Sequence, residues 1–139
     1  MKASWLYRIA SILLLFFAAG HTIGFRQTDP EWRVDSLVES MKSIHFNANG
    51  ADRAYWDFFV GFGLFVTVLM AFAAIVAWQF GGLPVETLAA MRLSTWGFAV
   101  CFAVVAYLSW RYFFMVPVIF SIVVFLCLAG AAWVSGGTR

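Results

Sequence analysis

Four long apolar stretches, separated by short polar segments, dominate the chain. They cover residues 5–25, 55–80, 93–110 and 113–134, and each is close to the roughly 20 apolar residues with which a helix crosses a bilayer. Only Arg111 and Tyr112 separate the last two stretches, so these should form a tight antiparallel pair. Residues 81–87 hold two glycines and a proline, which predicts a turn, and a short helix to Arg92 follows. The pattern predicts an all-α membrane protein, in which residues 1–139 form a single domain built as a four-helix transmembrane bundle.

The segment between the first two stretches carries most of the charge, with four basic and five acidic residues over 26–54. Its apolar residues recur every three or four positions from Trp32 to Ile44, which is the period of a one-sided helix. Asp29 and Pro30 suit a helix start, and residues 47–50, Asn-Ala-Asn-Gly, suit a stop. We expect an amphipathic helix over about 30–46 that lies on the membrane surface or across the mouth of the bundle, where it could act as a lid.

The composition agrees with lipid as the surrounding solvent. Hydrophobic residues make up 63% of the 139 residues and charged residues 12%, whereas soluble domains average about 45–50% and about 25%. A soluble fold of this size could not bury so much apolar surface, so most of it should face lipid. The net charge of +2 and the lack of a basic run argue against nucleic acid as a partner. Cys101 and Cys127 lie inside apolar stretches, where a thiol is typically a small buried hydrophobe.

The basic residues near the span ends bear on orientation. The first helix usually dominates topology, and it begins with Lys2 and Arg8, so we expect a multi-pass protein with both termini in the cytoplasm. The two sides are otherwise nearly balanced, with Lys2, Arg8, Arg92 and Arg139 on one and Arg26, Arg33, Lys42, Arg53 and Arg111 on the other. A signal peptide would also show basic residues before an apolar core, but Gly20 and Gly24 favour a surface for helix packing.

Two ionisable residues lie just inside the spans on the loop side. His21 is near the end of the first stretch and Asp57 near the start of the second, so both should lie at a similar depth below the headgroups. Gly20 and Gly24 share a stripe with His21, and Gly61 shares one with Asp57; small residues of this kind let membrane helices approach closely. A carboxylate at that depth needs a partner. We therefore expect His21 and Asp57 to meet as a buried polar pair, although Arg53, one turn before Asp57, is a second partner for the carboxylate.

The pair has a structural and a functional interpretation. The hydrogen bond could simply fix helix register, or it could provide a proton donor and acceptor with tuned pKa values, which makes His21 and Asp57 the candidate catalytic residues. Candidate ligand-binding residues on the same side are Thr22, Arg26, His45, Arg53, Tyr55 and Arg111. No cofactor and no metal are expected, because the chain has only two histidines, one of them in the loop, and no metal-binding spacing.

The segments "GHTIGF", "MKSIHF" and "RAYWDFFVGFG" resemble an uncharacterised family of small bacterial four-span membrane proteins. The resemblance implies a four-helix bundle in a bacterial inner membrane and no particular function. The leading hypothesis is a protein that binds a lipophilic small molecule or lipid in an intrabundle cavity near the extracytoplasmic face, where the pair could transfer protons. The alternative is an accessory or scaffold subunit of a larger membrane complex. The sequence leaves open whether the chain is an enzyme, and whether it forms a homo-oligomer.

Overall fold

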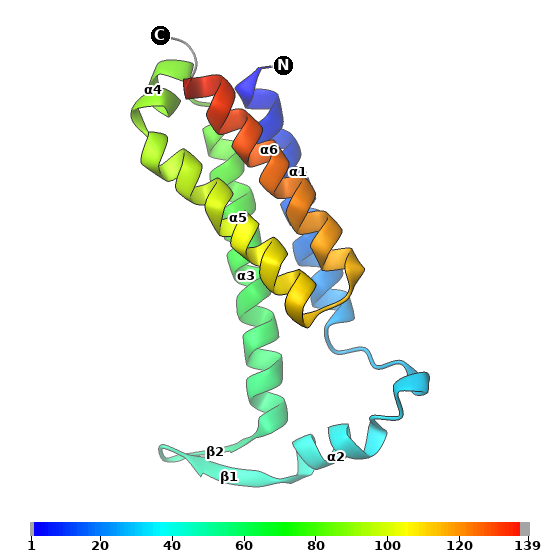
Figure 1. The fold of residues 1–139 in the computed structure, drawn as a ribbon. Coiled ribbons are helices and arrows are strands. Elements are labelled where there is room, and N and C mark those ends of the chain that lie inside the picture. Colours follow the sequence, from blue (N-terminus) through cyan, green and yellow to red (C-terminus); the bar gives the residue numbers. More distant parts are fainter. Residues whose placement is uncertain (1, 137–139) are drawn as a thin grey trace. The chain divides into compact units, whose positions relative to one another are not determined.

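The computed structural model describes residues 2–136, which are mostly helical (Figure 1). Within these residues, four helices are long and apolar enough to cross a membrane: α1 (Ala3–Gly24), α3 (Tyr55–Phe80), α5 (Arg92–Tyr112) and α6 (Met115–Gly136). Their ends lie within two residues of the expected positions. The predicted all-α membrane fold with four spans is therefore confirmed. Arg139, which entered the orientation argument, lies outside the described residues.

The chain folds as two compact units. Unit 1 consists of Met1–Phe17 and Met70–Arg139, and unit 2 of Ala18–Leu69. Unit 1 thus combines the first part of α1, the last part of α3, all of α5 and α6, and the short helix α4 (Val85–Ala90) after the predicted glycine and proline turn. Helices α5 and α6 form the expected antiparallel pair (Figure 1).

The core of unit 1 is built around small side chains. Ala10, Ala77 and Ala99 are fully buried, and the absence of larger groups at these positions lets helices approach closely. Ser11 Oγ donates a hydrogen bond of 2.7 Å to the carbonyl of Ala74, which ties α1 to α3 within this unit. The larger side chains of the core, such as Leu14 of α1, fill the space between these contacts.

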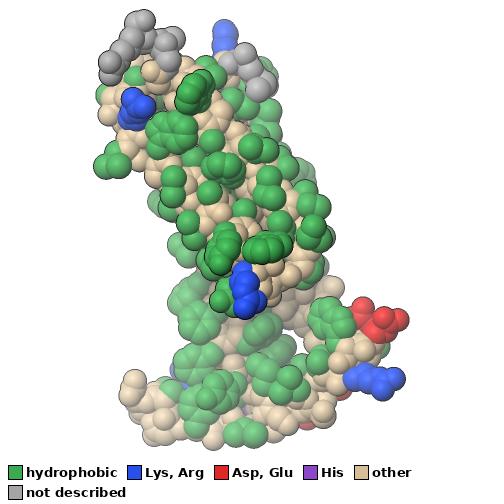
Figure 2. Space-filling model, viewed as in Figure 1, with side chains coloured by type: hydrophobic (Ala, Val, Ile, Leu, Met, Phe, Trp, Pro, Cys, Tyr) green, Lys and Arg blue, Asp and Glu red, His purple; other side chains and the backbone are tan. Residues whose placement is uncertain are grey.

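The outer surface of the helices is apolar. Figure 2 shows hydrophobic side chains over most of the face in view, with charged side chains confined to a few places. Phe65 of α3 and Leu93 of α5 are 66% and 89% exposed, respectively. Water would be an unfavourable solvent for side chains of this size, so lipid is the solvent that this surface suits.

The predicted amphipathic helix over 30–46 is not continuous in unit 2. The segment forms a 3₁₀ turn η1 (Pro30–Trp32), then α2 (Asp35–Ser43), and then a strand. Asp29 caps η1 as expected, since its side chain accepts a hydrogen bond from the Glu31 N–H. The helix cannot continue because Arg33 adopts a left-handed conformation (φ 51°) and donates its N–H to the Pro30 carbonyl.

Residues 45–54 form a β-hairpin that the sequence analysis missed (Figure 1). Strands β1 (His45–Ala48) and β2 (Ala51–Ala54) pair antiparallel, with His45 opposite Ala54. Asn49 (φ 54°) and Gly50 (φ 92°) both have positive φ at the turn, as a two-residue hairpin of the primed type requires. The stretch interpreted as a helix stop is thus a hairpin turn. Strand β2 passes into α3 with no intervening loop residue.

Candidate functional site

The predicted hydrogen-bonded pair of His21 and Asp57 is wrong. His21 Nε2 donates a hydrogen bond of 3.1 Å to the carbonyl of Gly63 on α3, so the proton of this ring nitrogen is committed to the backbone. The half-buried ring also stacks on Phe25, with centroids 5.1 Å apart and planes at 15°. His21 therefore acts as a cross-link between α1 and α3.

Two threonines extend this cross-link within unit 2. Thr22 Oγ1 donates to the Ala18 carbonyl at 2.7 Å and lies 2.9 Å from Thr67 Oγ1. Each threonine has one hydroxyl hydrogen and a backbone acceptor in its own helix, so either hydroxyl can donate in the contact between the two side chains. The backbone acceptor of Thr67 is the Gly63 carbonyl, 3.3 Å away. Thr22, a predicted ligand-binding residue, thus joins helices.

The glycine that lets α1 and α3 approach closely is Gly63, which the sequence did not single out. A methyl group added at Gly63 would lie 2.8 Å from Cζ of Phe25 and closer still to two other ring carbons. Methyl groups at Gly20, Gly24 or Gly61 would contact no described atom within 4 Å. The predicted packing role of these three glycines is wrong. The contacts with α3 come from His21, Thr22 and Phe25, which lie about 100–200° around the helix from Gly20.

Asp57 caps the start of α3. Its Oδ2 accepts a hydrogen bond of 2.9 Å from the N–H of Ala54, the residue before the helix. This bond satisfies a backbone donor at the junction of β2 and α3, and the negative charge lies in the first turn, where the helix dipole favours it. The Asp57 side chain is exposed, so the prediction that it faces the interior of the bundle is wrong.

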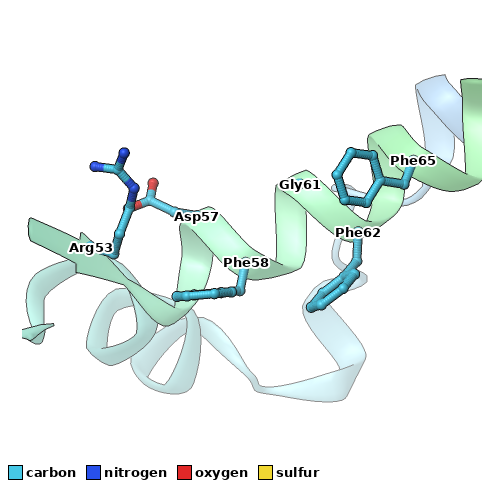
Figure 3. Close-up of a pocket in the computed structure, with 6 residues that line it drawn as sticks. All are labelled: Arg53, Asp57, Phe58, Gly61, Phe62 and Phe65. Atoms are coloured by element: carbon cyan, nitrogen blue, oxygen red, sulfur yellow. The ribbon is translucent and has the colours of Figure 1, made fainter. Parts of the chain in front are cut away.

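Asp57 also lines a shallow groove of about 180 Å³ along the first turns of α3 (Figure 3). Arg53 and Asp57 lie at one end of the groove, and its other walls are aromatic except at Gly61. In Figure 3, the side chains of Arg53 and Asp57 project from the same side of the chain. The complete set of lining residues is Arg53, Asp57, Phe58, Gly61, Phe62 and Phe65. The groove joins a charged end to an apolar channel.

The two charges in the groove are available for further contacts. The ion-pair contacts of residues 2–136 do not include one between Arg53 and Asp57. Arg53 Nη1 donates to the carbonyl of Asp52, which leaves most of its five N–H donors unused. Asp57 has one oxygen engaged by Ala54 and a second oxygen without a hydrogen-bond partner in the described part of the chain.

The hairpin holds Arg53 in this position. Arg53 pairs with Phe46 in the hairpin register, and the Phe46 ring packs against Tyr55 and Phe58, with centroid distances of 5.0 Å and 5.9 Å. Tyr55, a predicted ligand-binding residue, is 64% exposed and forms part of this aromatic contact. The side chain of Arg53 therefore projects from a strand that is fastened to the first turn of α3.

The remaining predicted ligand-binding residues lie outside the groove. His45 Nδ1 is 3.0 Å from Oδ2 of Asp52 in an exposed contact across the hairpin. Arg26 lies over the ring of Phe25 at 5.1 Å. Arg111 lies over the ring of Tyr112 and belongs to unit 1. Of the eight predicted site residues, the groove contains Arg53 and Asp57.

Phe58, Phe62 and Phe65 are groove residues that the sequence analysis did not identify. Their signal was present, because they follow Asp57 at helical spacing around Gly61, but an aromatic stripe in a span is also what lipid exposure produces. Among residues 2–136, no group of three or more His, Cys, Asp or Glu side chains could hold a metal ion. Comparisons with protein-family models, curated proteins and solved structures give no match.

Proposed function

We propose that this chain is an integral membrane protein that binds an amphipathic lipid, or a lipophilic small molecule with a polar head, in the α3 groove. The groove itself is the observation that carries the proposal, because it combines two unpaired charges with an apolar channel on a membrane-spanning helix. Arg53 and Asp57 would bind the polar head, and Phe58, Phe62 and Phe65 would contact the apolar part.

The depth of the groove residues supports this arrangement. Asp57 lies in the first turn of α3, where a span meets the headgroup region. Gly61 lies about 6 Å and Phe65 about 12 Å deeper, at 1.5 Å per helical residue. A ligand that follows the groove would therefore have its head among lipid headgroups and its tail among acyl chains.

The size and openness of the groove decide what kind of ligand fits. Enclosed sites for whole small molecules measure about 300–1,000 Å³, and the groove is smaller, at about 180 Å³. It can hold only one portion of a ligand while the remainder stays in the bilayer. This favours a membrane lipid lying on the helix over a molecule enclosed within the bundle, which replaces the intrabundle cavity of the leading hypothesis.

No reaction is part of this proposal. The expected proton relay needed His21 and Asp57 together, and His21 donates to Gly63 while Asp57 accepts from Ala54. The cellular setting stays as the sequence predicts it: a bacterial inner membrane, cytoplasmic termini, and the groove near the extracytoplasmic face.

Filling the groove tests the proposal. Gly61→Leu would place a side chain in the channel, and the fold should tolerate it because no described atom lies within 4 Å of the added Cβ. Gly97→Leu is a matched control, since Gly97 on α5 has the same open surroundings and lies outside the groove. We expect native mass spectrometry to detect fewer lipids per protein for Gly61→Leu than for the wild type or Gly97→Leu. Equal lipid retention by all three proteins would refute the proposal.

An accessory subunit of a larger membrane complex is the second candidate function. The exposure of α3 favours this function. Of its 18 most apolar consecutive residues, 6% are buried, against 22–33% in the corresponding stretches of the other three spans. If a partner protein covers α3, Gly61→Leu should reduce the size of the native complex in blue-native electrophoresis. Under the lipid-binding proposal the size of the native complex should not change.

A further inference from the structure

We infer that the α3 groove selects phospholipids whose headgroup carries both a phosphate and a primary ammonium. This inference rests on the proposed lipid binding and adds the chemistry of the headgroup. It comes from the presence of one cation and one anion at the same end of the groove, unpaired with each other. A headgroup with both charges complements both side chains.

Arg53 is suited to the phosphate. A guanidinium presents a planar set of N–H donors that can bind two phosphate oxygens at once. Only its Nη1 is engaged within the described residues, with the carbonyl of Asp52. That bond restrains the Arg53 side chain, and the contacts of Phe46 hold the hairpin that carries it, before a ligand arrives.

Asp57 is suited to the ammonium. A primary ammonium has three N–H donors, and the Asp57 carboxylate has an oxygen that the Ala54 N–H does not occupy. A quaternary ammonium has no N–H, so a choline headgroup could not form this hydrogen bond. A headgroup without a cation would let Arg53 bind its phosphate but would offer no positive charge to Asp57, which disfavours it relative to a headgroup that carries both charges.

The two residues flank the junction of β2 and α3. Arg53 lies two residues before the first residue of α3, Asp57 is in its first turn, and the Asp57 cap on Ala54 fixes the junction between them. The apolar channel at Gly61 begins one turn beyond Asp57. An acyl chain can therefore enter the channel while the headgroup remains between the two charges.

A competition between three lipids tests the inference. The protein is reconstituted into vesicles of equal parts phosphatidylethanolamine, phosphatidylcholine and phosphatidylglycerol with identical acyl chains, and the bound lipids are counted by native mass spectrometry. A charge-assisted hydrogen bond should enrich the ethanolamine lipid over the choline lipid about tenfold, which corresponds to about 1.4 kcal/mol.

Three variants assign the effect to residues. Asp57→Asn keeps an oxygen that can accept the Ala54 N–H, so folding should be preserved while the ethanolamine preference falls to near parity. Arg53→Gln should reduce the binding of all three lipids, and Arg53→Lys should restore part of it because the charge returns without the planar donor set. Gly61→Leu should remove groove-bound lipid of every headgroup.

Each contrary result has a defined meaning. Lipid that depends on Gly61 but shows no ethanolamine preference, or a preference that survives in Asp57→Asn, overturns the headgroup inference and leaves lipid binding intact. Lipid that does not depend on Gly61 overturns the proposed function and the inference with it. A lipid-free dimer that Gly61→Leu dissociates would assign the groove to a second copy of the chain and also overturn the inference.

Discussion

Replacing Gly63 with alanine should weaken the contact between α1 and α3 that organises unit 2. The added methyl group would overlap the ring of Phe25, which lies 2.8 Å or less from the new carbon at three of its atoms. Gly61→Ala is the matched control two residues earlier on the same helix. Its methyl group would contact no described atom within 4 Å.

The expected magnitude follows from two effects. Alanine is more favourable than glycine inside a helix by about 0.8–1.0 kcal/mol, and this gain applies to both variants. Overpacking costs about 1–3 kcal/mol, and it applies only to Gly63→Ala. If the Phe25 ring turns away instead, it loses its contacts with His21 and Phe59, at about 0.5–1.5 kcal/mol for each aromatic pair. By either route, Gly63→Ala should be less stable than Gly61→Ala by about 1–3 kcal/mol.

The free energy of unfolding in mixed detergent micelles measures this difference. Both variants are titrated with denaturing detergent beside the wild type, and size-exclusion profiles establish that each begins as the folded protein. Gly61→Ala should unfold at or above the wild-type midpoint, and Gly63→Ala below the midpoint of Gly61→Ala. Equal midpoints for the two variants would refute the reasoning, because they would mean that Phe25 and Gly63 are not in contact.

Three further results are expected. In a double-mutant cycle, Thr22→Val and Thr67→Val should show a coupling of about 0.6–1.7 kcal/mol in the free energy of unfolding, the range for hydrogen bonds between membrane helices, and strict additivity would contradict the contact. Gly50→Ala should disfavour the left-handed turn conformation by about 1–2 kcal/mol and weaken the cross-strand amide contacts in nuclear magnetic resonance spectra, while an unchanged spectrum would argue against the primed turn. Asp52→Asn should alter the free energy of unfolding by less than about 1 kcal/mol, because its contact with His45 is exposed, and a larger loss would mean that the pair is shielded from solvent.

The four spans could be predicted because their signal does not depend on tertiary contacts. A helix that crosses lipid needs a sufficient length of apolar residues whatever it packs against, so composition alone places its ends. The rotation of each helix could not be predicted in the same way. Lipid is as apolar as a helix interface, so the packed and lipid-facing sides of a span carry similar residues. This is why Gly61 and Gly63 could be distinguished only in the structure.

The hairpin, by contrast, left a signal that could have been used. Asn49-Gly50 is the preferred pair for a two-residue hairpin turn. The helical period from Trp32 to Ile44 runs almost up to this pair, and therefore favours the end of a helix there over a hairpin turn. The charged end of the groove was found because Arg53 and Asp57 are ionisable residues beside a span. The aromatic channel was missed because phenylalanines are ordinary in lipid-facing helices.

The direct junction of β2 and α3 has a consequence for the vertical position of this span. With no loop residue between the two elements, α3 cannot slide toward the middle of the bilayer without pulling a hydrogen-bonded pair of strands after it. That movement would carry the charges of Asp52 and Arg53 into hydrocarbon, which is strongly unfavourable. The hairpin therefore limits how deeply α3 can enter the bilayer, and residues that precede the span fix its depth.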